Sequence, residues 1–135
     1  YLIRRKGFAG IHLYCMTNEL SLKKWGSLQS DLETFRDYHR RFYLEFRGRG
    51  LDVGLLASDA APISSWWTIQ WAADHMDDFT AAYGGHHYFN RFPPDNVRFY
   101  PWFLEQCRRG VDIARSRNKP FVIGEFGCKQ DSRVI

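Results

Sequence analysis

The chain has few cysteines, and none of them are close together in the sequence. Cys15, Cys107 and Cys128 are odd in number and widely spaced, and no CxxC pair occurs. This spacing indicates neither a disulfide framework nor a zinc site. Cys15 and Cys107 are expected instead to be small buried hydrophobic residues, the first in a strand and the second in a helix.

The sequence also lacks long apolar runs, low-complexity segments and interdomain linkers. No stretch of about 18 apolar residues is present, so no membrane-spanning helix is expected. The net charge is only +4 over 135 residues, and the basic residues are scattered. Scattered basic residues favour solvated helix surfaces over a nucleic-acid interface. We therefore expect one domain over residues 1–135, with neither a membrane nor a nucleic acid as partner.

An initiator methionine and a signal peptide are also missing. The opening YLIRRK is expected to be the last turns of a helix that Gly7 stops, and the chain ends at Ile135 without a closing helix. We expect the chain to be part of a longer polypeptide, so the remainder of its fold would lie outside this sequence. No cellular compartment is assigned, because the true N-terminus is expected to be missing.

Apolar runs and helical stripes alternate along the chain. Strands are expected at residues 11–18, 53–57, 80–88 and 121–125, and helices at residues 30–48, 64–76 and 99–117. The strands are continuous apolar runs, which is typical of a parallel sheet buried under helices. A complete (β/α)8 TIM barrel takes about 250 residues. The fold class is therefore expected to be α/β, with four βα units that form roughly half of a parallel (β/α)8 barrel.

Polar residues occur at the end of each expected strand, where barrels of this class carry their active sites. These residues are Asn18 and Glu19, then Ser58 and Asp59, then His86 and Tyr88, and finally Glu125. A carboxylate that closes a buried strand is costly unless it is paired or functional. Glu19 and Glu125 would suit glycosidic bond cleavage, which needs one proton donor and one nucleophile or base.

Three motifs carry a family resemblance: Thr17-Asn18-Glu19, His86-His87-Tyr88 and Gly124-Glu125-Phe126-Gly127. In this order and spacing they resemble the clan-A retaining glycoside hydrolases, the cellulase-like, mannanase-like and β-xylosidase-like (β/α)8 group. In that group Asn-Glu ends the fourth barrel strand, His-x-Tyr the sixth and the nucleophilic Glu the seventh. The resemblance covers nearly the whole chain. One departure is Leu20, where the group usually has a proline that constrains the turn after the acid.

The resemblance implies a role for each matched residue. Glu19 would be the general acid and base, and Glu125 the nucleophile. Asn18 would bind the sugar 2-hydroxyl, Tyr88 would donate a hydrogen bond to the Glu125 carboxylate, and His86 would line the site. Partial burial and the charge of Glu125 would raise the pKa of Glu19, as an acid catalyst requires. A separation of about 5 Å between the two carboxyl groups would give retention of configuration.

The two adjacent histidines have a second interpretation as metal ligands. No Cys, Asp or Glu lies at the usual local spacing, so neither a metal nor another cofactor is expected. Neighbouring residues in a strand point to opposite faces. His86 is therefore expected to share a face with Tyr88, and His87 to pack under a helix.

Three further residues are candidates for substrate binding. Asp59 would either bind substrate or cap the following helix. Trp66, beside Trp67, would either form a sugar platform or belong to the core. Trp25, in the loop after Glu19, is a comparable platform candidate.

Three interpretations of the function follow from these residues. The first is a retaining O-glycosidase that acts on an oligo- or polysaccharide. The second is an inactive relative that still binds carbohydrate, and the third is a truncated catalytic domain without activity of its own. The two intact glutamates favour the enzyme, because a binding protein has no need of opposed carboxylates.

Overall fold

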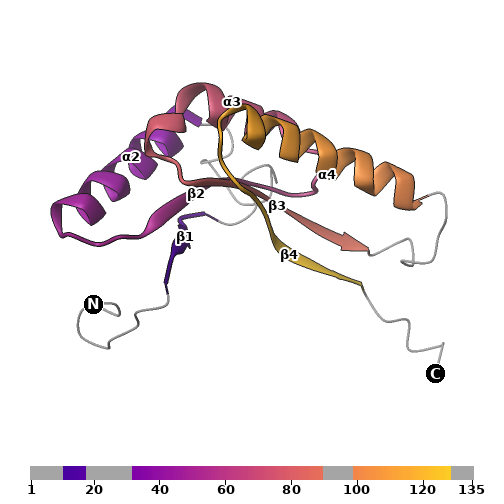
Figure 1. Cartoon of the computed structure of the whole chain (residues 1–135), viewed down its shortest axis with the longest axis horizontal. Coiled ribbons are helices and arrows are strands. Elements are labelled where there is room, and N and C mark those ends of the chain that lie inside the picture. Colours follow the sequence, from indigo (N-terminus) through magenta and orange to yellow (C-terminus); the bar gives the residue numbers. More distant parts are fainter. Residues whose placement is uncertain (1–10, 18–31, 90–98, 129–135) are drawn as a thin grey trace.

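Four parallel strands form the centre of the computed structural model, which describes residues 11–17, 32–89 and 99–128. The strands are β1 (Leu13–Cys15), β2 (Gly54–Ala60), β3 (Ala82–Phe89) and β4 (Phe121–Cys128), and they lie side by side in this order. The helices are α2 (Leu32–Gly48), α3 (Trp66–His75), the 3-10 turn η3 (Asp77–Phe79) and α4 (Phe99–Ser116). Figure 1 shows the helices on one face of a curled sheet, so the described residues form an α/β half-barrel.

The core lies between the sheet and the helices. Its buried members are Phe35, Ala57, Ala60, Ile69, Ala72, Ala73, Met76, Tyr83 and Ala114. Four of these residues are alanines in β2 and α3, and their small side chains allow the helix to lie close to the sheet. We call the sheet face against this core the outer face, and the opposite face the inner face.

A polar cluster joins η3 to the chain before β4. The Tyr83 hydroxyl donates to Asp77 Oδ1 at 2.6 Å, and Lys119 Nζ contacts the same oxygen at 2.6 Å and also the backbone oxygen of Asp77. Burial and the Asp77 carboxylate raise the pKa of Tyr83. Burial alone would raise the pKa of Asp77, but the hydrogen bonds from Lys119 and Tyr83 outweigh it and lower that pKa. The cluster therefore fixes the end of the sheet opposite to the expected active site.

The first strand differs most from the sequence-based prediction. It was expected at residues 11–18 as a buried run, but β1 spans only Leu13–Cys15 and all three residues are exposed. Cys15, predicted to be buried, is therefore exposed, and Cys107 is half-buried. Among the described residues β1 pairs only with β2, so no neighbouring strand covers its other side. Tyr14 packs on α2, where it stacks on Phe42 with 6.1 Å between ring centroids.

Two other strands are longer than predicted at their carboxyl ends. β2 continues through Ser58 and Asp59 to Ala60, and β4 continues past Glu125 to Cys128. Ser58 and Asp59, expected to follow the second strand, therefore lie within β2, and Glu125, expected to end the fourth strand, lies inside β4. Each strand contains a register irregularity, between Ala57 and Asp59 in β2 and opposite the Gly85–His86 step in β4.

Candidate active site

Three polar side chains meet on the inner face of the sheet. The Tyr88 hydroxyl donates a hydrogen bond to Glu125 Oε2 at 2.7 Å. His86 Nδ1 lies 3.6 Å from the same carboxylate oxygen. β3 provides the tyrosine and the histidine, β4 provides the glutamate, and His86 pairs directly with Glu125 in the parallel ladder. We call this group the Glu125 cluster.

The members of the Glu125 cluster differ in their access to solvent. The His86 side chain is 5% exposed, whereas the Glu125 side chain is 42% exposed. Tyr88 is 45% exposed. A ligand can therefore reach the carboxylate and the phenol, while the imidazole beneath them is held by its surroundings. A phenol that donates to a carboxylate fixes the orientation of that carboxylate.

The two adjacent histidines point to opposite faces, as their positions in one strand predicted. The ring centroid of His87 lies 5.7 Å from that of Trp102 and 5.3 Å from that of Phe103, both on α4. Burial lowers the pKa of His87. His87 is thus part of the packing between β3 and α4, and His86 alone of the pair faces Glu125.

The remaining candidate residues of the described chain lie apart from the Glu125 cluster or at its margin. Trp66 is half-buried and packs against the core, and the Arg109 guanidinium lies 5.4 Å from its ring centroid. Its neighbour Trp67 is 50% exposed, so Trp67 offers a more accessible ring. Asp59 pairs with Gly84, two residues before His86 on β3. The substrate-binding roles of Trp66 and Asp59 stay predictions.

Asn18, Glu19 and Trp25 lie outside the described residues. The separation between Glu19 and Glu125, and with it the expected distance of about 5 Å, therefore stays a prediction.

Gly127 lies beside the Glu125 cluster, and the sequence alone assigned it no role. It pairs with Tyr88, and a Cβ atom at this position would lie 3.3 Å from two carbons of the Tyr88 ring. The sequence did contain a signal of this role. Residues i and i+2 of a strand share a face, so the glycine two residues after Glu125 lies on the face of the carboxylate.

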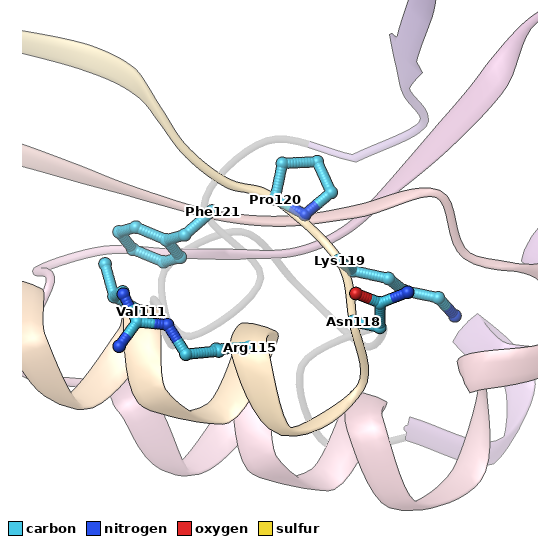
Figure 2. Close-up of a pocket in the computed structure, with 6 residues that line it drawn as sticks. All are labelled: Val111, Arg115, Asn118, Lys119, Pro120 and Phe121. Carbon is cyan, nitrogen blue, oxygen red and sulfur yellow. The ribbon is translucent and has the colours of Figure 1, made fainter.

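A pocket of about 370 Å³ lies elsewhere, between the last turns of α4 and the start of β4 (Figure 2). Its lining residues are Val111, Arg115, Asn118, Lys119, Pro120 and Phe121. Phe121 begins β4, and Glu125 is four residues further along it. This pocket thus lies at the opposite end of β4 from Glu125. The candidate site is the open inner face of the sheet that carries the Glu125 cluster.

The described ranges contain neither a metal-type cluster of side chains nor a membrane-spanning helix. No group of three or more His, Cys, Asp or Glu side chains there could hold a metal ion. None of the helices in those ranges is both long and apolar enough to cross a bilayer. Comparison of the chain with protein-family models, with curated proteins and with solved structures gave no match.

Proposed function

We propose that the chain belongs to a retaining O-glycoside hydrolase of the clan-A type, with Glu125 as the nucleophile and Glu19 as the acid and base. The observation that carries the proposal is the Glu125 cluster. Its carboxylate is solvent-accessible on the inner face of a parallel half-barrel and accepts a hydrogen bond from Tyr88 at 2.7 Å. This is the contact that the resemblance implied for a nucleophile and its tyrosine partner.

The chemistry proceeds in two displacements. The Glu125 carboxylate attacks the anomeric carbon, the glycosidic bond breaks, and the leaving oxygen takes the proton of Glu19. Glu19, now ionised, then removes a proton from water, whose oxygen displaces Glu125 from the sugar. Two inversions give net retention. The hydrogen bond from Tyr88 orients the carboxylate, and in the covalent ester the same phenol is released to contact the substrate.

We further propose that the working enzyme is a complete (β/α)8 barrel. The described sheet has β1 and β4 at its edges, each with one neighbour, and barrel closure would pair both. Apolar side chains near these edges are exposed, including Tyr14 on β1 and Phe126 on β4. Further βα units would cover them, and such units would also supply the other walls of the sugar site.

The decisive experiment compares two glutamate variants in the complete barrel. Glu125→Gln should abolish turnover of every substrate, because no covalent intermediate can form. Glu19→Ala should still be glycosylated by an aryl glycoside whose leaving group needs no proton, while deglycosylation slows for lack of a base. Azide should then restore turnover and give a glycosyl azide of retained configuration. With a small residue at Glu125, azide should instead give the inverted product.

Glu105→Gln is the matched control, because Glu105 is a carboxylate on the surface of α4 that pairs with Arg108 and Arg109. It should leave turnover unchanged. Opposite behaviour of the Glu19 and Glu125 variants would exchange their roles. Full activity in both would place the catalytic pair elsewhere, and carbohydrate binding without turnover in the unsubstituted barrel would favour the inactive relative.

A further inference from the structure

β4 contains one more residue than β3 over the segment in which the two strands pair. Ile123 pairs with Gly85, and the next pair is Glu125 with His86. Gly124 is therefore the extra residue of a β-bulge. Such a bulge leaves one residue outside the ladder and changes the face to which the following side chains point.

Phe121 fixes the face on which β4 begins. Its ring fills the space beside Gly110 of α4, where an added Cβ atom would lie only 2.7 Å from the ring. Phe121 also pairs with Tyr83, a member of the core, so both residues belong to the outer face. In a regular strand every second residue shares a face. Without the bulge, Glu125 would therefore point to the outer face together with Phe121.

On the outer face Glu125 would lie away from both Tyr88 and His86. An unbulged β4 would set Glu125 opposite His87, whose ring packs against Trp102 and Phe103. Phe126 takes that place in the structure and is 75% exposed, so a carboxylate there would be solvated but would lose the hydrogen bond from Tyr88. The bulge instead places Glu125 opposite His86 on the inner face, where Tyr88 donates to it.

The same one-residue shift brings Gly127 opposite Tyr88. The Tyr88 ring occupies the space where a side chain of residue 127 would begin, because an added Cβ atom would lie 3.3 Å from two of its carbons. That distance is shorter than an ordinary contact between carbon atoms, about 3.5–4.0 Å. A larger side chain would therefore displace the ring whose hydroxyl contacts Glu125.

We propose that the bulge at Gly124 and the absent side chain at Gly127 form one positioning device for the Glu125 carboxylate. The bulge takes Gly124 out of the ladder, so that Glu125 stays opposite His86 on the inner face, and Gly127 leaves the room in which the Tyr88 ring reaches the carboxylate. Gly127 is thus a positioning residue, and Gly124 is the residue that the bulge absorbs. The geometry holds whatever ligand the site binds, and only its consequence for turnover rests on the proposed function.

The test is a carbon-13 NMR titration of the full-length protein labelled at the tyrosine Cζ atoms. The Tyr88 signal is assigned as the one that Tyr88→Phe removes. It should move when acid protonates the Glu125 carboxylate, and Glu125→Gln should abolish that movement. Gly127→Val should reduce the movement by half or more, and Gly127→Ala should reduce it less. Gly48→Ala is the control, because nothing lies within 4 Å of an added Cβ atom there.

Deletion of Gly124 tests the bulge itself. Glu125 would then follow Ile123 directly, and a regular strand would still place it opposite His86. The Tyr88 signal should therefore keep its carboxylate-dependent movement, although a residue has been removed from a strand. The proposal is overturned if the deletion variant folds but loses this movement, or if Gly127→Val folds and keeps it in full.

Circular dichroism and enzyme kinetics separate a misfolded variant, a failed positioning device and a failed functional proposal. Near-ultraviolet circular dichroism shows whether each variant is folded. If Gly127→Val is not folded, Gly127→Ala tests the role of Gly127 in its place. A Gly127→Ala protein that shows the full movement would then overturn the role of Gly127. In the complete barrel, Gly127→Val should lower kcat with KM nearly unchanged. Normal NMR behaviour in a protein that cleaves no glycoside would contradict the proposed function and leave the positioning device intact.

Discussion

At the scale of single residues, His39 is a titratable side chain placed where water does not reach it. It is fully buried on α2, its ring centroid lies 5.7 Å from that of Phe35 and 5.9 Å from that of Phe79, and its Nε2 lies 3.4 Å from Thr80 Oγ1. Burial lowers the pKa of His39 to about 4, against an opposing contribution from the backbone of Phe79. The folded protein therefore favours the neutral imidazole.

This shift predicts a loss of stability in acid. The pKa is lower in the folded chain than the 6.5 of an unperturbed histidine, so the unfolded chain takes up the proton first. The stability that the neutral His39 contributes is fully present above pH 6.5. The free energy of unfolding then falls by about 3 kcal/mol as the pH falls towards 4. His39→Phe should remove this dependence. The measurement is the free energy of urea unfolding of both proteins between pH 7.5 and pH 4, and parallel curves would contradict the prediction.

Residue patterns predicted part of the candidate site. Alternation along one strand separated His86 from His87, and the structure confirms that His87 packs under a helix while His86 faces Glu125. Alternation alone would have failed for Glu125, which is four residues after the outward Phe121. Alternation predicts an outward Glu125, and only the bulge explains why the residue points inward. A bulge depends on how β4 pairs with β3, and a single sequence does not contain that pairing. The failed burial of Cys15 has a similar cause, because burial depends on neighbours beyond the strand itself.

At the scale of elements, the bulge in β2 is held by a hydrogen bond to α3. Ser58 is the extra residue and has a backbone φ of 53°, in the left-handed region that side chains usually avoid. Its buried hydroxyl donates to Thr68 Oγ1 at 2.7 Å, and the Thr68 hydroxyl donates to the backbone oxygen of Ser65 at 2.9 Å. The first turn of the helix thus anchors the strand beside Asp59.

Two substitutions at Ser58 should separate the hydrogen bond from the backbone conformation. Ser58→Ala loses a buried hydrogen bond, which costs about 1 kcal/mol, and retains the unfavourable φ. Ser58→Gly loses the same bond but relieves about 1 kcal/mol of backbone strain, because glycine adopts positive φ freely. The glycine variant should therefore be more stable than the alanine variant. Denaturant unfolding measures both, and an alanine variant that is the more stable of the two would show that Ser58 carries no strain.

The order and type of the elements were well predicted, and their boundaries less so. The helix expected at residues 99–117 is α4, Phe99–Ser116. It was predicted well because its apolar stripe continues over many turns. The strand ends were placed too early in β2 and β4. Polar residues were taken as the end of each strand, whereas β2 continues past Ser58 and Asp59 to Ala60 and β4 continues past Glu125 to Cys128. Ser58 is accommodated by its hydrogen bond to Thr68 of α3, and Glu125 by the hydrogen bond from Tyr88.

At the scale of the whole molecule, apolar side chains are exposed where the half-barrel ends. Phe126 on β4 is 75% exposed and Ile123 is 39% exposed. On the other edge strand, Leu13 is 41% exposed and Tyr14 is 40% exposed. Exposed apolar surface beside an open strand edge favours association, because the edge carries unpaired backbone groups.

The 135-residue chain should therefore self-associate when it is produced alone. We expect its mean mass, measured by light scattering after size exclusion, to rise above that of the 15.9 kDa monomer as the concentration increases. Ile123→Thr combined with Phe126→Thr should shift the mass back towards the monomer, because threonine retains strand propensity while removing apolar area. Leu44→Gln on α2 is the control, since Leu44 is 53% exposed but lies away from β4. The threonine variants should differ from this control.

A chain that stays monomeric and unfolds cooperatively would show that its edges need no further βα units, and the complete-barrel proposal would then be withdrawn.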